Sequence, residues 1–137
     1  NDAAATTSSP QQVGSLTTWS KVSCGNTNVT AIKTDGTLWS WGNGNPGGAV
    51  GDNASVDRSS PVQLGSLTTW AEVETGSDVS IAMKTDGTIW AWGNGASYGK
   101  TGQGDLIARS SPIQVGSLDS WKAIAAGAST VGALREA

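Results

Sequence analysis

Side chains that commonly perform catalysis are sparse in this sequence. It contains no histidine, so a serine nucleophile would find no imidazole base and no Cys–His pair can form. Asp35 and Asp86 resemble a catalytic carboxylate pair, but each directly precedes a glycine and is explained as a turn residue. We therefore expect no catalytic residue and no enzymatic activity. Cys24 has no second cysteine to pair with, and we predict that it is a small buried apolar group.

Two patterns resemble ligand sites and are better explained as loops. Asp52 and Asp57 suggest calcium ligands, but their spacing fits no EF-hand. In the second copy of the surrounding motif, Gln103 and Ala108 replace these two aspartates. The run 42–47 matches the glycine pattern of dinucleotide-binding loops, yet no helix pattern follows it. We expect neither a metal nor a cofactor.

The composition excludes two classes of partner. Only 14% of residues are charged, the net charge is −3, and the eight Lys and Arg residues are scattered singly. A nucleic-acid surface needs a cluster of such residues, so we expect no nucleic acid as partner. No stretch approaches the ~20 apolar residues of a membrane span, so we expect no membrane insertion. Nineteen glycines and seven tryptophans favour many short strands joined by turns.

The elements that position these residues come from an internal repeat. Residues 8–19 recur as 59–70 and again as 110–121, in steps of 51 residues. Residues 33–44 return as 84–95 at the same interval. A repeat of this length indicates stacked supersecondary units. The chain therefore divides into an N-terminal extension (1–7), two full repeats (8–58 and 59–109) and a partial third repeat (110–137).

Each full repeat carries the patterns of four short strands. Asp-Gly at 35–36 and at 86–87 predicts a two-residue hairpin turn between apolar runs. The fourth strand contains Pro10, Pro61 or Pro112, which lacks an amide donor and favours a sheet edge or a strand start. Four short strands per unit predict an all-β fold of propeller blades. The other predicted strands are 19–23, 29–33 and 37–41 in the first repeat, and 70–74, 79–84 and 88–92 in the second.

We predict that the tryptophans pack in the core and that the long loops contact partners. Tryptophans that recur at strand positions are predicted to form the core, although exposed indoles could instead stack on sugar rings. The predicted core set is Trp19, Trp39, Trp41, Trp70, Trp90, Trp92 and Trp121. The glycine-rich loops 42–58 and 93–109 would present a variable surface on a rigid scaffold. Their predicted contact residues are Asn45, Pro46, Asp52, Tyr98, Lys100 and Asp105.

One known repeat family has this order of motifs. Ser-Ser-Pro-x-Gln-x-Gly, Trp-x-x-Val-x-x-Gly and Ala-x-Lys-Thr-Asp-Gly-Thr-x-Trp-x-Trp-Gly resemble the RCC1-type (regulator of chromosome condensation-like) repeat, over residues 8–134. The resemblance implies RCC1-like β-propeller blades, seven of which usually close a ring. The chain departs from the family in having no histidine after Val-x-x-Gly and in ending its third repeat without the hairpin turn. Seven units would need about 360 residues, so this chain alone is predicted to form an incomplete ring.

The function that we expect is binding and assembly. We predict a non-enzymatic structural or recognition module that assembles with other proteins or with itself, as a homo-oligomer or a larger assembly. The near-identical repeats resemble the bacterial and phage branch of the family, which implies a virion fibre, tail or capsid-decoration component, or a bacterial surface component. The localisation would then be the virion or the cell surface. The alternative is a secreted propeller-type binder, either an enzyme inhibitor or a lectin with a cell-surface glycan as partner.

Overall fold

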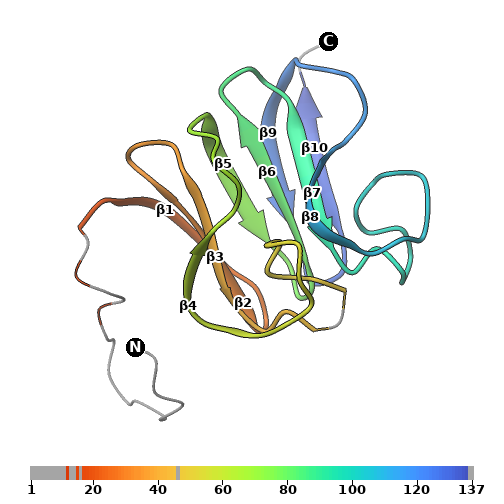
Figure 1. Cartoon of the computed structure of the whole chain (residues 1–137). Helices are drawn as coiled ribbons and strands as arrows, with labels where there is room; N and C mark the ends of the chain where they lie inside the picture. The colour runs from red at the N-terminus through yellow and green to blue at the C-terminus, as the bar shows by residue number, and fades with distance from the viewer. Residues whose placement is uncertain (1–11, 13–14, 16, 46, 136–137) are drawn as a thin grey trace.

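The computed structural model describes residues 12, 15, 17–45 and 47–135, and all regular structure within them is antiparallel β-strand (Figure 1). The all-β prediction is thereby confirmed. The predicted N-terminal extension, Pro10 and Pro46 lie outside the described residues. The strands are β1 (Trp19–Cys24), β2 (Asn28–Lys33), β3 (Leu38–Gly42), β4 (Arg58–Gln63), β5 (Trp70–Thr75), β6 (Val79–Lys84), β7 (Ile89–Gly93), β8 (Arg109–Gln114), β9 (Trp121–Ala126) and β10 (Val131–Arg135).

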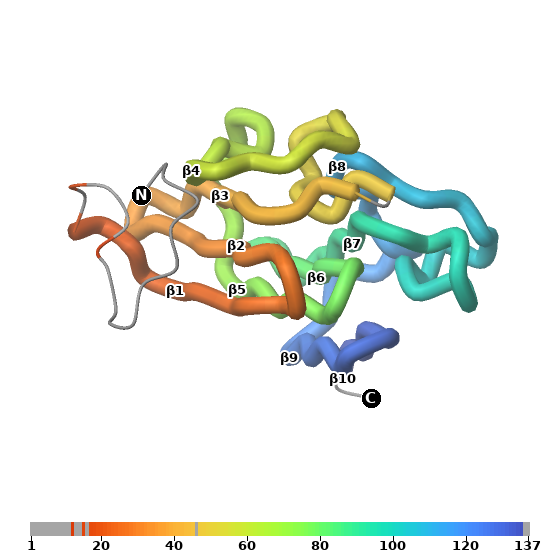
Figure 2. The backbone as a smooth tube through the Cα atoms, turned by 90° about the horizontal axis from the view of Figure 1, so that it is seen from below, coloured from red at the N-terminus to blue at the C-terminus, as the bar shows by residue number. Residues whose placement is uncertain are grey.

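The strands form three sheets that lie side by side as successive blades (Figure 2). The first sheet has the order β1-β2-β3-β4, the second β5-β6-β7-β8, and the third contains only β9 and β10. The first strands are neighbours, because β1 contacts β5 and β5 contacts β9. Pro61 lies in β4 and Pro112 in β8, each an edge strand of its sheet, as predicted. Over the described residues the sheets do not close into a ring.

Each complete sheet draws its last strand from the start of the next repeat. The first sheet runs from β1 at Trp19 to β4 at Gln63, and the second from β5 at Trp70 to β8 at Gln114. The sheets are therefore offset from the repeats 8–58 and 59–109 by the length of one strand and its connection. This offset links successive blades covalently, since the segment that begins one repeat completes the sheet before it.

The hairpin turns differ from the prediction in their length. Gly36 N donates to Lys33 O at 2.9 Å, so Thr34 and Asp35 are the central residues of the turn. Gly36 follows with a φ of 78°, a left-handed conformation that glycine adopts without strain. The connection is thus a three-residue loop with a glycine bulge, not the predicted two-residue turn, which would need positive φ at Asp35 as well. The second hairpin repeats this arrangement at Gly87.

The hydrophobic core lies between the first two blades. Side chains from both sheets meet there, and the cluster consists of Ile32, Leu38, Leu64, Trp70, Val73, Ala82 and Trp92. The middle blade is the most deeply buried because it has a neighbour on each side. Val73 in this blade is 4% exposed, whereas Val22, at the same position of the first blade, is 64% exposed. Burial therefore depends on the adjacent blade as well as on residue type.

The structure places the predicted core residues and the cysteine in different surroundings. Trp70 and Trp92 are buried, while the other five tryptophans of the predicted core set are half-buried. The prediction for Cys24 was wrong, because this residue is exposed. It ends β1, on the face of the first blade that no described segment covers. Its repeat equivalent Thr75, which faces the first blade, is buried.

Candidate functional site

A lysine, an aspartate and two tryptophans of each full blade form one network around the hairpin. Lys84 Nζ lies 3.6 Å from the ring centroid of Trp90 and 5.0 Å from that of Trp70. The two rings meet edge to face at 5.9 Å. An ammonium over an indole face is attracted by the ring quadrupole, which partly offsets the cost of burying it. That burial lowers the pKa of Lys84.

The aspartate of this network is a turn residue. Asp86 Oδ1 accepts hydrogen bonds from the amide and the hydroxyl of Thr88, and the same hydroxyl accepts one from Trp90 Nε1 at 3.0 Å. These hydrogen bonds favour the carboxylate, with the Thr88 hydroxyl contributing most, and lower the pKa of Asp86. Asp35 makes the same bonds to Thr37, and its pKa is lowered in the same way. Each carboxylate therefore stabilises the turn of its own hairpin.

The first long loop, residues 43–57 between β3 and β4, is held by an ion pair and by the second blade. Arg58 Nη2 lies 2.5 Å from Asp52 Oδ2, so this predicted contact residue is engaged within its own loop. Asn53 N donates to Ser110 O of β8. Gly51 lies so close to Trp92 that an added Cβ would be 2.4 Å from the indole nitrogen. Asn45, another predicted contact residue, is exposed.

The second long loop, residues 94–108 between β7 and β8, is held by two ion pairs. Lys100 Nζ lies 2.9 Å from Asp78 Oδ1 with its side chain largely buried. Arg109 Nη2 lies 2.6 Å from Asp105 Oδ2, and Asp105 Oδ1 accepts a hydrogen bond from Ile107 N. Lys100 and Asp105, both predicted as partner contacts, thus have partners inside the molecule. These bonds fix the course of the loop and leave its apolar residues outside.

Exposed apolar side chains gather on this second loop. Tyr98 is 91% exposed and has a φ of 69°, and Leu106 and Ile107 are exposed as well. The backbone beside Tyr98 passes Leu106, since a Cβ placed on Gly99 would lie 3.8 Å from Leu106 Cδ2. We call Tyr98, Leu106 and Ile107 the loop patch. Large exposed apolar groups that gather on a rigid loop are typical of protein contact sites.

Sequence reasoning predicted Tyr98 and missed the other two members of the loop patch. The available signal was comparison between repeats. The first loop has a glycine at the position of Tyr98 and Ser55 at the position of Leu106. Both substitutions add apolar surface to the second loop. Ser55 is exposed, so the position of Leu106 faces solvent even where a full blade follows.

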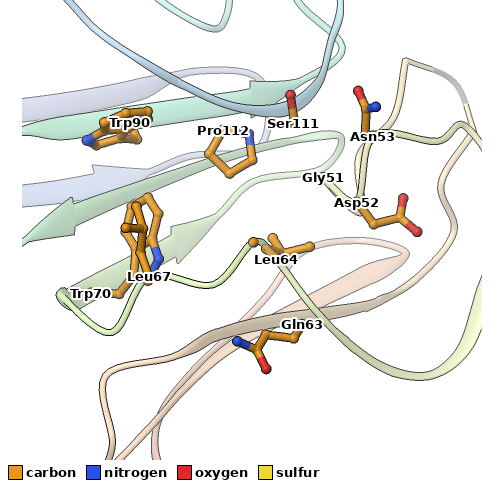
Figure 3. A pocket seen from close by; sticks show the side chains of 11 residues that line it. Gly51, Asp52, Asn53, Gln63, Leu64, Leu67, Trp70, Trp90, Ser111 and Pro112 are labelled. Carbon is orange, nitrogen blue, oxygen red and sulfur yellow. The ribbon is translucent and has the colours of Figure 1, made fainter.

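A pocket of about 320 Å³ lies between the first two blades, next to the first long loop (Figure 3). Its apolar side is formed by Leu64, Leu67, Trp70, Trp90 and Pro112, and its polar side by Asp52, Asn53, Gln63 and Ser111. The indoles are poor platforms for stacking, because Trp70 is buried and Lys84 already lies against both rings. Asp52 is taken by Arg58. The pocket combines apolar walls with a polar rim in which Asp52 is already paired with Arg58.

The described residues were also compared with the requirements of a metal site and of a membrane span. Among the described residues no group of three or more Cys, Asp or Glu side chains could hold a metal ion. In the same part of the chain no helix is long and apolar enough to cross a membrane. Binding can use two features, the exposed loop patch and the interblade pocket.

Comparison with known proteins identifies the repeat. Models of the regulator of chromosome condensation (RCC1) repeat match residues 19–47, 35–83 and 86–134. The chain therefore belongs to the RCC1 repeat family. It is 33% identical over 87 residues to the E3 ubiquitin-protein ligase HERC2 of Homo sapiens and of Mus musculus. That match covers 61% of this chain and 2% of the ligase.

Solved structures have the same fold. Human WBSCR16 matches with a TM-score of 0.79 and 19% identity, over 93% of this chain and 33% of that chain. Prp20p from Saccharomyces cerevisiae matches with a TM-score of 0.73 and 20% identity, over 95% and 33%. Yeast RCC1 (Prp20) bound to Kap60 gives a TM-score of 0.72 with 19% identity, over 95% and 32%. The chain spans about a third of these proteins, and the likeness confirms RCC1-like propeller blades.

Proposed function

We propose that this chain is a non-enzymatic protein-binding module that binds other proteins through the loop patch and further copies of itself through its blade faces. The observation that carries the proposal is the patch of Tyr98, Leu106 and Ile107, exposed on a loop that two ion pairs hold in place. A preformed apolar surface loses little conformational entropy on binding, which favours affinity.

Two solved relatives support protein as the class of partner. The structure of Prp20p is described with its binding properties to Gsp1p and histones, and another structure contains yeast RCC1 bound to Kap60. Both matched chains have the fold of this one, at 20% identity or less. Gsp1p, histones and Kap60 are partners of the matched proteins. For this chain they support only the proposal that its partner is a polypeptide.

Exchanging the loop patch for its counterpart in the first loop tests the proposal. The variant carries Tyr98→Gly, Leu106→Ser and Ile107→Val, the residues that the first loop has at these positions. Peptides would be selected from a displayed random library against the native chain, and their Kd measured by calorimetry. We expect at least a tenfold loss of affinity in the variant, because aromatic residues at the centre of a contact commonly contribute about 2 kcal/mol or more.

A matched control separates the loop patch from apolar surface in general. Leu118 is an exposed leucine between β8 and β9, outside both long loops. Leu118→Ser makes the same substitution as Leu106→Ser at an exposed leucine outside the patch, and it should leave the Kd of the selected peptides unchanged. Equal affinity of the patch variant and the native chain would reject the loop patch as the binding site, and so would an equal loss in Leu118→Ser.

A glycan-binding lectin or an enzyme inhibitor is the alternative. The interblade pocket is the feature that favours a small ligand, since it offers the Asn53 and Gln63 amides beside apolar walls. A glycan array separates the lectin from a protein-binding module, because a module or an inhibitor that recognises protein should give no hits. Reproducible binding to one class of glycan would favour the lectin. Loss of that binding in Asn53→Ala would place the glycan in the pocket.

The predicted setting in a virion or on a cell surface stays a prediction. The relatives that match are human, mouse and yeast proteins, and the chain covers a small part of each. Support for a fibre, tail or capsid-decoration role comes only from the near-identity of the repeats. Labelling intact virions or cells with an antibody to the chain would test it, and internal staining alone would contradict it.

A further inference from the structure

The pocket between the first two blades is enclosed by described residues of those two blades alone. All of its lining residues lie between positions 51 and 112. They belong to the first long loop, to β4 and the connection that follows it, and to β5, β7 and β8. Both blades have four strands. The shape of the pocket is therefore set by two complete blades and needs no further unit of the stack.

One end of the pocket is apolar (Figure 3). Leu64 and Trp70 are buried there, and Leu67 is 46% exposed. Lys84 Nζ lies over the rings of Trp70 and Trp90, so one face of each indole is already occupied. A sugar or an aromatic ring needs a free indole face for stacking. An aliphatic group needs only close contact with apolar walls, which this end provides.

The other end of the pocket is polar and offers no free charge. Asn53 and Gln63 are exposed at the rim, and Ser111 is half-buried. Asp52 is the one charged residue in the described lining, and its carboxylate pairs with Arg58. Primary amides both donate and accept hydrogen bonds, as peptide groups do. The rim therefore matches an uncharged ligand that carries peptide groups better than it matches an ion.

The pocket and the loop patch lie close together along the chain. Ile107 belongs to the patch and Ser111 to the pocket, and β8 begins between them at Arg109. The four residues from 107 to 111 span at most about 14 Å, the length of fully extended chain. A bound segment of about five extended residues can therefore reach from one to the other.

We propose that the interblade pocket binds one aliphatic side chain, leucine or isoleucine, of the polypeptide that binds the loop patch. The Asn53 and Gln63 amides bind the peptide groups beside that side chain. The inference rests on the proposed function, since it takes the loop patch as the first contact. The size of the pocket supports a single side chain, because about 320 Å³ lies at the lower end of the range of ligand sites, about 300–1,000 Å³.

A leucine with both ends blocked tests the pocket by itself. The probe is N-acetyl-leucine N-methylamide, which has one aliphatic side chain and two peptide groups. It is titrated into the isotope-labelled native chain while NMR records the indole signals of Trp70 and Trp90 and the amide signals of Asn53 and Gln63. We expect saturable shifts with a Kd on the order of 1 mM, because a probe of about 13 non-hydrogen atoms gains only modest affinity.

Two other probes establish what the pocket recognises. N-acetyl-glycine N-methylamide keeps the peptide groups without the side chain, and methyl glucoside represents a sugar. Neither should give saturable shifts at the same concentration. Equal binding of the glycine probe would overturn the inference, and so would the absence of binding by the leucine probe. Binding of methyl glucoside alone would also overturn it, in favour of the lectin.

The repeat supplies matched control variants. Ser111→Phe fills the pocket and should abolish the shifts, whereas Ser60→Phe adds the same ring at the equivalent, exposed position of β4. Leu67→Ser removes part of the apolar wall and should weaken the leucine probe roughly tenfold. Leu118→Ser, at the equivalent of Leu67, should leave its binding unchanged. Equal effects of variant and control would place the probe outside the pocket and overturn the inference.

The peptides selected against the native chain connect the pocket to the loop patch. Their Kd should rise at least tenfold in Ser111→Phe, since a buried anchor is lost. Equal affinity for Ser111→Phe and for the native chain would overturn the inference and leave the proposed function standing. Unchanged peptide affinity in the patch variant, with the probe lost only in Ser111→Phe, would instead reject the proposed function. Circular dichroism shows whether each variant is folded, and Leu67→Ser decides the question if Ser111→Phe is not.

Discussion

At the scale of single residues, the Asp-Gly-Thr sequence of each hairpin connects a surface turn to a tryptophan. Asp86 accepts from Thr88, and Thr88 accepts from Trp90, whose ring lies under the Lys84 ammonium. The first blade repeats this chain of contacts from Asp35. The carboxylates are thus structural parts of the blade, and their ionisation should affect stability.

We expect acid to destabilise the protein partly through Asp35 and Asp86. Their folded pKa values lie below the ordinary 3.8, so this stability is present above pH 3.8 and is lost as the pH falls through the folded pKa values. The double variant Asp35→Asn/Asp86→Asn should be less stable near pH 7 and should lose less stability between about pH 4 and pH 2. Urea unfolding at several pH values measures both effects. A variant with the native pH dependence would contradict this role.

The residue types predicted the positions of the turns but not the exposure of Cys24. An aspartate followed by a glycine favours a turn, because the carboxylate hydrogen-bonds the nearby backbone and glycine accepts a positive φ. The position of the turn could therefore be predicted from these two residues. The exact turn length could not, because it depends on the register of the hydrogen bonds around Lys33. Cys24 is apolar enough for a core, but whether it is buried depends on what packs against its strand, which the strand itself does not encode.

At the scale of elements, the same strand position can be a core site or a surface. Trp92 is fully buried between two blades, and Gly51 of the first long loop presses on it, whereas its equivalent Trp41 is half-buried. Repeat equivalence predicted the strands within about one residue. It could not predict this difference, because equivalent residues in different blades have different neighbours.

We expect Trp92→Ala to cost roughly 3–5 kcal/mol, the usual range for removing a large aromatic side chain from a packed core. Trp41→Ala should cost clearly less, since Trp41 is only half-buried. Chemical unfolding of both variants compares the two sites. Equal losses would contradict the account of burial by the neighbouring blade.

The second long loop should depend on its largely buried ion pair. Lys100→Met keeps the aliphatic stem and removes the charge that pairs with Asp78, so an acceptor is left without its partner. We expect a loss of about 1–3 kcal/mol and faster hydrogen exchange of the amides between 96 and 107. Asp119→Asn, a change of charge outside this loop, is the control. Unchanged exchange in Lys100→Met would show that the ion pair does not hold the loop.

At the scale of the whole molecule, the described residues form a stack of three successive blades. The 51-residue repeat predicted propeller blades, and the resemblance of its motifs to the RCC1 repeat implied RCC1-like blades and an incomplete ring. The family match confirmed the repeat, and the solved structures confirmed the fold. An incomplete ring already implies exposed blade faces, but which residues these faces expose appears only when equivalent positions are compared for burial. Val22 and Leu134 are ordinary apolar residues in sequence, and in the structure they are 64% and 67% exposed.

Sedimentation equilibrium of the native chain and of Leu134→Asp over a range of concentrations tests most directly whether the blade faces recognise one another. The account predicts a native mass that rises with concentration above the 13.8 kDa of one chain. Burying a charge against a second copy is costly, so folded Leu134→Asp, with a charge on an exposed blade face, should stay at 13.8 kDa. A native chain that remains at 13.8 kDa at every concentration, with its sheet spectrum intact, would contradict the central claim.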